Sequence, residues 1–236
     1  MKWPISRAFG CSRALAAAGI LGVLALVSCA PPRSSRIVVG AKNFTEQVVL
    51  GELVAQEIEA VTGQRVERRF YLAGSYLCQQ ALVSGRIDTY VEYTGTALTA
   101  ILKQPLPPPG QRDATTVFRQ VSQLYEQRYA VKVEPGLGFE DTFAMVVRGA
   151  DAQRLALKTI SDAVKVAPTW RLGVGYEFES RPDGLPGLSA AYGLKFSGPP
   201  RTMDLGLLYR ALSAGQVDMV AGNSTDGPIQ IGRAHV

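Results

Sequence analysis

The octapeptide ALVSGRID, residues 81–88, is written a second time near the end of the chain as ALSAGQVD, residues 211–218. In both copies a run of helix-forming residues reaches a glycine, and a β-branched residue follows two positions later. Glycine readily adopts the left-handed conformation that ends many helices. Each copy therefore predicts a helix, a turn and a strand, although so short a repeat can also arise by chance because these residues are common at such junctions.

A loop rich in threonine, serine and glycine follows each predicted strand, at 94–96 after the first copy and at 224–227 after the second. In open α/β sheets, ligands bind just beyond the carboxyl ends of the strands. One such unit in each half of the chain predicts an α/β protein whose two lobes close on a small solute.

The amino terminus has the features of an export signal. Three basic residues precede an apolar stretch, residues 14–27, that is too short to span a bilayer comfortably. The stretch ends in the lipobox sequence Leu26-Val27-Ser28-Cys29. We therefore predict a lipoprotein signal peptide at 1–28, rather than an ordinary signal peptide or a stray hydrophobic helix.

Cleavage at this site would leave Cys29 carrying a diacylglycerol, followed by a polar tether, residues 29–35. This predicts an exported protein that is lipid-anchored to a membrane on the extracytoplasmic side. Cleavage also removes three basic residues and no acidic ones, which lowers the formal net charge from +5 to +2. The remaining basic residues are scattered, so we expect no nucleic-acid partner.

Cysteine usage is that of an exported protein without disulfides. Cys11 leaves with the signal peptide and Cys29 is lipidated, so Cys78 has no cysteine with which to pair. We expect Cys78 to be a small buried hydrophobe on a helix at 75–84. We predict no catalytic residue, no metal and no cofactor.

Residues 230–236 can be encoded by the first bases of a common sequencing adaptor. On this hypothesis the natural sequence is represented only to about Ile229, and the fold is truncated at its carboxyl terminus. His235, the only histidine, would then carry no function.

We predict a first lobe at 36–138, which lacks its carboxy-terminal return, and a second lobe at 139–229. The first lobe is expected to hold a mostly parallel sheet and three helices. Its strands are predicted at 37–39, 66–71 and 87–91, and its helices at 43–63, 75–84 and 115–128. In the first of these helices, Asn43 and Glu46 form a capping-box pattern. Its buried side is predicted to hold Val48, Val49, Leu53 and Ile58.

The second lobe is predicted to alternate strands and helices in the same way. Its strands are expected at 142–147, 172–174 and 217–221, and its helices at 161–167, 185–192 and 205–214.

Four segments resemble the glycine betaine/choline/carnitine-type substrate-binding proteins of osmoprotectant ABC transporters. They are VGAKNFTEQ at 39–47, VEYTGT at 91–96, EFESRPDG at 177–184 and MDLGLLY at 203–209. The resemblance covers residues 36–229. It implies a two-lobed periplasmic-binding-protein-like (type II) α/β fold with a ligand cleft between the lobes. It also implies a monomeric receptor that delivers a quaternary amine to an ABC permease and its ATPase.

The resemblance also implies roles for individual residues. A trimethylammonium group has no N–H donor, so aromatic ring faces are suited to bind it, and a carboxylate needs fixed cations or hydroxyl groups. Lys42, Thr96 and Arg181 are expected to bind the carboxylate, Tyr93 to form a cage wall and Asp141 to lie beside the ammonium. Phe143 and Asn223 stand where relatives often place further tyrosines, so a weaker or different ligand is implied.

Other classes of function remain open at this point. The same receptor could take an amino acid, a polyamine or ergothioneine. An exported α/β enzyme is a further alternative, but the chain has neither a Gly-x-Ser-x-Gly motif nor a pattern of metal ligands. A lipoprotein that binds other proteins would need no polar pocket.

Overall fold

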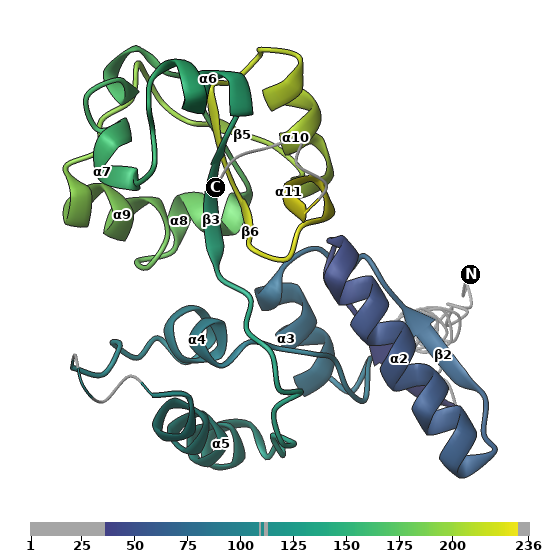
Figure 1. Ribbon diagram of the computed structural model, residues 1–236. Helices are drawn as coiled ribbons and strands as arrows, with labels where there is room; N and C mark the ends of the chain where they lie inside the picture. Colours follow the sequence, from purple (N-terminus) through teal and green to yellow (C-terminus); the bar gives the residue numbers. More distant parts are fainter. Residues whose placement is uncertain (1–35, 109, 111–112, 231–236) are drawn as a thin grey trace, which may run out of the picture. The chain divides into compact units, whose positions relative to one another are not determined.

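The computed structural model describes residues 36–108, 110 and 113–230 (Figure 1). The predicted signal peptide, the lipidation site Cys29, the tether up to residue 35 and residues 231–236 lie outside the described residues. Within the described ranges, no helix is both long and apolar enough to cross a bilayer.

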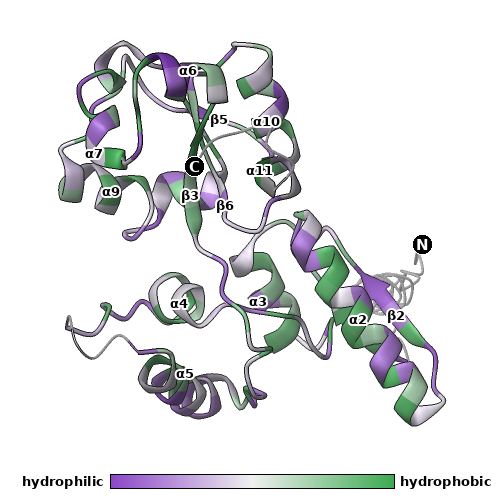
Figure 2. Cartoon of the chain, in the orientation of Figure 1, coloured by the Kyte–Doolittle hydropathy of each residue, from purple (hydrophilic) through white to green (hydrophobic). Residues whose placement is uncertain are grey.

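The first half of the described chain contains a two-stranded parallel sheet. Strand β1 (Ile37–Gly40) pairs with β2 (Val66–Arg69) so that Ile37 lies opposite Val66. Figure 2 shows β2 as largely hydrophilic, because charged residues follow Val66. The helical segments here are α2 (Thr45–Thr62), α3 (Ser75–Val83), α4 (Thr94–Thr96), η1 (Ala97–Ile101) and α5 (Ala114–Tyr129).

The predicted third strand at 87–91 is wrong, because only a single parallel bridge forms there, between Val39 and Thr89. At this point a side chain takes the place of a ladder carbonyl: the Asp88 carboxylate accepts the Val38 N–H at 2.8 Å. Two backbone hydrogen bonds also form here: the Asp88 N–H donates to Val38 O and the Gly40 N–H donates to Thr89 O, each at 2.8 Å. The chain then leaves β1.

The second half contains a four-stranded mixed sheet in the order β3–β6–β4–β5. Strands β3 (Phe143–Val147) and β6 (Met219–Asn223) are antiparallel, whereas β4 (Leu172–Val174) is parallel to both β6 and β5 (Arg201–Thr202). The helical segments are α6 (Gly149–Arg154), α7 (Ile160–Ala163), η2 (Ala167–Thr169), α8 (Tyr176–Ser180), α9 (Leu185–Tyr192), α10 (Leu205–Ser213) and α11 (Gly227–Gln230).

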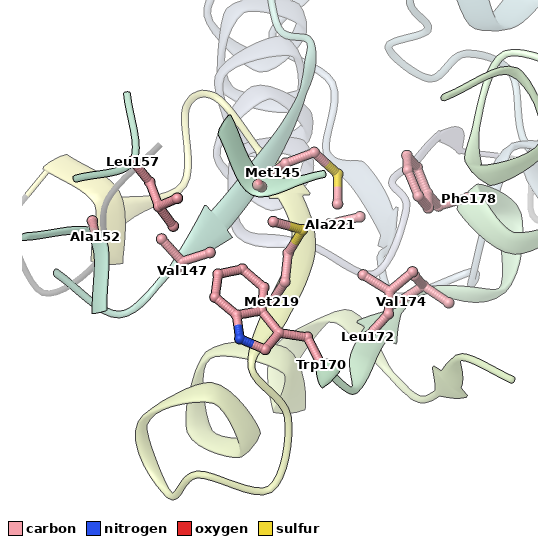
Figure 3. Packing of buried hydrophobic residues seen from close by; sticks show 11 residues of the cluster. Met145, Val147, Ala152, Leu157, Trp170, Leu172, Val174, Phe178, Met219 and Ala221 are labelled. Carbon is pink, nitrogen blue, oxygen red and sulfur yellow. The ribbon is translucent and has the colours of Figure 1, made fainter. Parts of the chain in front are cut away.

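Both faces of this sheet are buried. Met145 and Val147 of β3 join a cluster with Trp170, Leu172 and Met219 (Figure 3). Their neighbours Ala144 and Val146 point to the opposite face and join a cluster with residues of α10. Figure 2 accordingly shows β3 as hydrophobic along its length. Burial on both sides gives the sheet a rigid edge from which loops can project.

The two copies of the octapeptide fold in the same way. Gly85 and Gly215 both have φ near 67°. Two residues after each glycine, a β-branched residue is fully or nearly fully buried, and the aspartate that follows donates its N–H to the neighbouring strand at 2.8 Å in both copies, to Val38 O and Arg171 O. The repeat therefore describes a real structural unit that occurs once in each half.

Helix α2 differs from its prediction. It begins at Thr45 after Phe44, and no side chain caps it, so the predicted Asn43 cap is wrong. Its buried residues are Gln47, Gly51 and Ala55, whereas the exposed fractions of Val49 and Leu53 are 52% and 59%. The reason is close packing: a Cβ on Gly51 would lie 2.9 Å from the Phe70 ring. Small residues therefore face β2, and two of the four aliphatic residues expected inside point away.

Candidate ligand-binding site

A cavity of about 1110 Å³ is lined by residues from both halves of the chain. Its wall includes the ends of β1 and β6, the beginning of β3 and the loops around α4 and α8. All seven predicted ligand-binding residues lie on this wall. They are Lys42, Tyr93, Thr96, Asp141, Phe143, Arg181 and Asn223. Carboxyl ends of parallel strands meet here, as the sequence predicts.

Arg181 is the C-cap of α8 and is 92% buried, since its exposed fraction is 8%. Its Nε and Nη2 donate to the two oxygens of Asp183 at 2.9 and 2.7 Å. Its Nη1 donates to Thr96 Oγ1 at 2.9 Å, and its guanidinium carbon lies 5.1 Å from the centre of the Phe143 ring. Burial opposes ionisation of Asp183, but the hydrogen bonds and charge of Arg181 lower the pKa of Asp183 overall.

Lys42 lies two residues after the end of β1 and is almost completely buried. Its ammonium forms an ion pair with Glu92 and lies 4.8 Å from the centre of the Tyr93 ring. The same carboxylate accepts the Tyr93 N–H at 2.8 Å and, through its other oxygen, the Tyr90 hydroxyl at 3.2 Å. Lys42 is therefore already bound to a carboxylate of the same wall.

Tyr93 brings an aromatic face and a polar tip to the cavity. Its ring is stacked with Phe44 at a centroid distance of 6.3 Å and an interplanar angle of 23°. Its hydroxyl donates to Glu46 and accepts from Gln47 Nε2 at 3.2 Å. Burial raises the pKa of Tyr93 above its usual range, so the ring remains a neutral phenol.

Phe143 and Asn223 lie directly opposite each other in the β3–β6 ladder. Asp141, two residues before Phe143, accepts the Ser224 hydroxyl at 3.1 Å. Burial, and next the charge of Glu46, raise the pKa of Asp141. Two positions along one sheet edge thus carry a ring and a carboxamide, with a partly buried carboxylate beside them.

Two features of this wall were missed by the sequence analysis. Phe44 lies inside the quoted segment 39–47, but the helix-capping interpretation drew attention to Asn43 instead. Asn43 Nδ2 in fact donates to Asp204 Oδ2 in the second half at 3.0 Å.

The other missed feature is Glu177, which opens the quoted segment 177–184. Its carboxylate accepts the Ser75 N–H, and Ser75 Oγ at 3.2 Å, at the amino terminus of α3. A Cβ on Gly74 would lie 2.1 Å from Glu177 Oε1, so a larger residue at this position would require the Glu177 side chain to move. A carboxylate is favourable at the amino terminus of a helix. Helix α3 has no acidic residue in its own first turn, and this could have indicated that a carboxylate from elsewhere in the chain binds there.

The described part of the chain holds one cysteine, Cys78, and no histidine. Residues 36–108, 110 and 113–230 contain no group of three or more His, Cys, Asp or Glu side chains that could hold a metal ion. Cys78 is buried, and this burial raises the pKa of its thiol to about 12. It therefore stays protonated at neutral pH.

The fold and the cavity define a class: an α/β solute-binding protein of the periplasmic-binding-protein type, with a polar and aromatic cavity between its two parts. The model of the family described as the substrate binding domain of ABC-type glycine betaine transport systems matches residues 35–231. The chain belongs to this family, which is a family of transporter binding proteins rather than enzymes.

Relatives of known function agree in class and differ in solute. A carnitine transport binding protein of Listeria monocytogenes is 32% identical, over 87% of this chain and 68% of the relative. An ergothioneine transport permease/ergothioneine binding protein of Helicobacter pylori is 29% identical, over 82% of this chain and 34% of the relative. The chain thus spans about a third of one relative's length and about two thirds of the other's.

A solved structure agrees with the fold. The crystal structure of a glycine betaine/carnitine/choline ABC transporter protein aligns with 85% of this chain and 73% of its own, with a TM-score of 0.62 and 28% identity. The predicted fold class is confirmed.

Proposed function

We propose that this protein is an extracytoplasmic receptor that binds a quaternary ammonium solute in its cavity and delivers it to an ABC-importer permease and its ATPase. Glycine betaine, choline and carnitine are the solutes we consider. The observation that carries the proposal is the stacked pair of Phe44 and Tyr93 on the cavity wall, with Glu46 at the Tyr93 hydroxyl.

The chemistry of an onium ion supports this assignment. Its charge is permanent and cannot be satisfied by accepting or donating a hydrogen bond, so electron-rich ring faces and nearby carboxylates are the groups that stabilise it. Tyr93 already holds one cation, since the Lys42 ammonium lies 4.8 Å from the ring centre. A solute would therefore use the part of the ring that faces the cavity, together with Phe44 and Phe143.

The proposal includes several features that come from the sequence alone. We propose that residues 1–28 are removed, that Cys29 carries the lipid and that the receptor works as a monomer at a membrane surface. We also propose the division into lobes at 36–138 and 139–229 and the absence of catalysis.

A calorimetric titration tests the proposal. The purified protein is titrated with glycine betaine, choline, carnitine and, as a non-onium control, proline. We expect at least one onium solute to bind and proline not to bind. Tyr93→Ala should weaken binding about 30-fold, because a desolvated cation–π contact contributes on the order of 2 kcal/mol. Tyr93→Phe keeps the ring face and should weaken binding far less. Absence of binding by every onium solute would contradict the proposal.

A larger betaine such as ergothioneine is the second candidate. The cavity volume of about 1110 Å³ slightly exceeds the usual range of roughly 300–1,000 Å³ for small-molecule sites, which leaves room for a group larger than an acetate. A relative of this chain is named for ergothioneine binding. Adding ergothioneine to the titration decides between the two, since a tighter affinity for it than for any simple onium solute would favour the second candidate.

A further inference from the structure

The charged residues on the cavity wall are mostly acidic. Five carboxylate residues line it, against two basic ones, Lys42 and Arg181. The acidic residues are Glu92, Glu140, Asp141, Glu177 and Asp183. Glu46 does not line the cavity but binds the hydroxyl group of the wall residue Tyr93. The charge of this wall therefore favours a positively charged solute.

Both basic side chains already hold carboxylates. Arg181 binds both oxygens of Asp183, at 2.9 and 2.7 Å, and a second carboxylate, Glu177, lies 4.0 Å from its Nη1. Lys42 is paired with Glu92 and is only 3% exposed. A solute carboxylate at Arg181 would be the third negative group around one guanidinium, and at Lys42 it would have to displace Glu92.

The acidic groups near the aromatic pair are bound differently. Glu46 accepts the hydroxyl of Tyr93, and Asp141 accepts the hydroxyl of Ser224. These partners are neutral, so these contacts leave the negative charges of Glu46 and Asp141 uncompensated. Glu46 and Asp141 also repel each other electrostatically. A cation placed between them would relieve this repulsion as well as meeting the ring faces.

We infer that the cavity selects solutes of net positive charge, quaternary ammonium alcohols of the choline kind, over zwitterionic betaines. This inference rests on the proposed function and narrows its substrate class. A hydroxyl group can donate to a wall carboxylate, whereas a carboxylate of the solute is repelled by it. Selection therefore comes from repulsion of the betaine as much as from attraction of the cation.

The test compares choline with glycine betaine, which share the trimethylammonium group and differ in bearing a hydroxymethyl or a carboxylate group. Calorimetry on the full chain at physiological ionic strength should give an affinity for choline at least tenfold tighter. An equal or tighter affinity for glycine betaine would overturn the inference but leave the proposed function intact. No binding of either solute would overturn the inference, and the proposed function would fall with it only if carnitine and ergothioneine also failed to bind.

Two variants test which charged residues cause the preference for choline. Asp183→Asn keeps the shape of the side chain but removes the charge that neutralises Arg181, so the preference for choline should fall at least fivefold. Asp141→Asn removes a charge beside the ammonium group that both solutes share, so it should weaken the binding of both several-fold and keep their ratio close to the wild-type value. Each variant is first checked for a native circular dichroism spectrum. If folded Asp183→Asn keeps the wild-type ratio of affinities, the inference is overturned.

Discussion

The two copies of the octapeptide have one backbone geometry but unequal surroundings. In the second copy Asp218 accepts hydrogen bonds from the backbone and guanidinium of Arg171 and from Arg148, and the strand continues as β6 between β3 and β4. In the first copy Asp88 accepts the Val38 N–H, and the pairing with β1 is a single bridge at Thr89. The repeat therefore determines the turn from helix to strand, whereas the length of the strand that follows depends on the neighbouring strands.

The two copies also carry different residues into the site. Tyr93 lies five residues after Asp88, and Asn223 lies five residues after Asp218. Both line the cavity, so positions with the same spacing from the repeat present a ring in the first half and a carboxamide in the second. We infer that the first copy supplies the binding chemistry and the second supplies the rigid frame.

The largest expected effect is on stability. Asp218→Ala should lower the free energy of unfolding by about 3 kcal/mol, because it removes the carboxylate to which two partly buried arginines and the Arg171 N–H donate. Asp88→Ala, at an exposed position, should cost only about 1 kcal/mol. Urea denaturation of the two variants measures both values. Equal losses would show that the surroundings of the two copies do not matter.

The same comparison has a pH dependence. Hydrogen bonds from Arg171 are the main cause that lowers the pKa of Asp218. A lowered folded-state pKa adds stability above the unfolded pKa of about 4, and this stability is lost as the pH falls through the folded-state value. The difference between wild type and Asp218→Ala should therefore be full at pH 7 and shrink in acid. A difference that is constant down to pH 2 would rule out the ion pairs as its cause.

The next effect concerns affinity at the equivalent positions. Tyr93→Ala should reduce onium affinity by about 2 kcal/mol, and Asn223→Ala by well under 1 kcal/mol, since only the first removes a ring face. Asn223→Tyr should tighten binding by adding a second ring. Titrations of the three variants with one onium solute test this order. A larger loss at Asn223 would reverse the proposed roles of the two copies.

A smaller effect tests the shared backbone. Gly85→Ala and Gly215→Ala should each cost about 1 kcal/mol, because an L-residue is strained at φ near 67° and the added Cβ meets no atom within 4 Å in either copy. The losses should agree within experimental error. Unequal losses in urea denaturation would mean that the turns are not equivalent.

The smallest effect concerns Asp141. Its raised folded-state pKa adds stability below the unfolded value of about 4, and this contribution is lost as the pH rises through the folded-state value. Ionised Asp141 thus destabilises the protein at neutral pH, so Asp141→Asn should raise the melting temperature slightly at pH 7 and leave it unchanged at pH 3. A lower melting temperature at pH 7 would show that Asp141 is a structural residue.

The sequence was sufficient where local chemistry decides the structure. Strand 172–174 and helix 185–192 lie where they were predicted, since glycines and polar turns bound both. It was not sufficient where tertiary contacts decide. The segment 87–91 forms only the Val39–Thr89 bridge, whereas the chain after Asp218 continues as a strand between β3 and β4. The outward position of Val49 follows from the close approach of Gly51 to Phe70.

In the binding site, too, local sequence motifs indicated which residues take part, and tertiary contacts decided how they pair. The seven expected residues could be placed on one wall from motifs alone, but their pairing could not. That Arg181 is held by Asp183, and Lys42 by Glu92, depends on side-chain positions that spacing does not determine. Glu177 was missed for the same reason, since its partner Ser75 is 102 residues away in the sequence.

The central claim is that the cavity recognises the positive charge of an onium group. The most direct measurement compares choline with 3,3-dimethylbutan-1-ol, in which a carbon atom replaces the charged nitrogen at almost the same size and shape. Calorimetry on the wild-type protein should show binding of choline and at least 30-fold weaker binding of the neutral alcohol. Equal affinities would mean that the cavity recognises shape and apolar surface alone, and would contradict the claim.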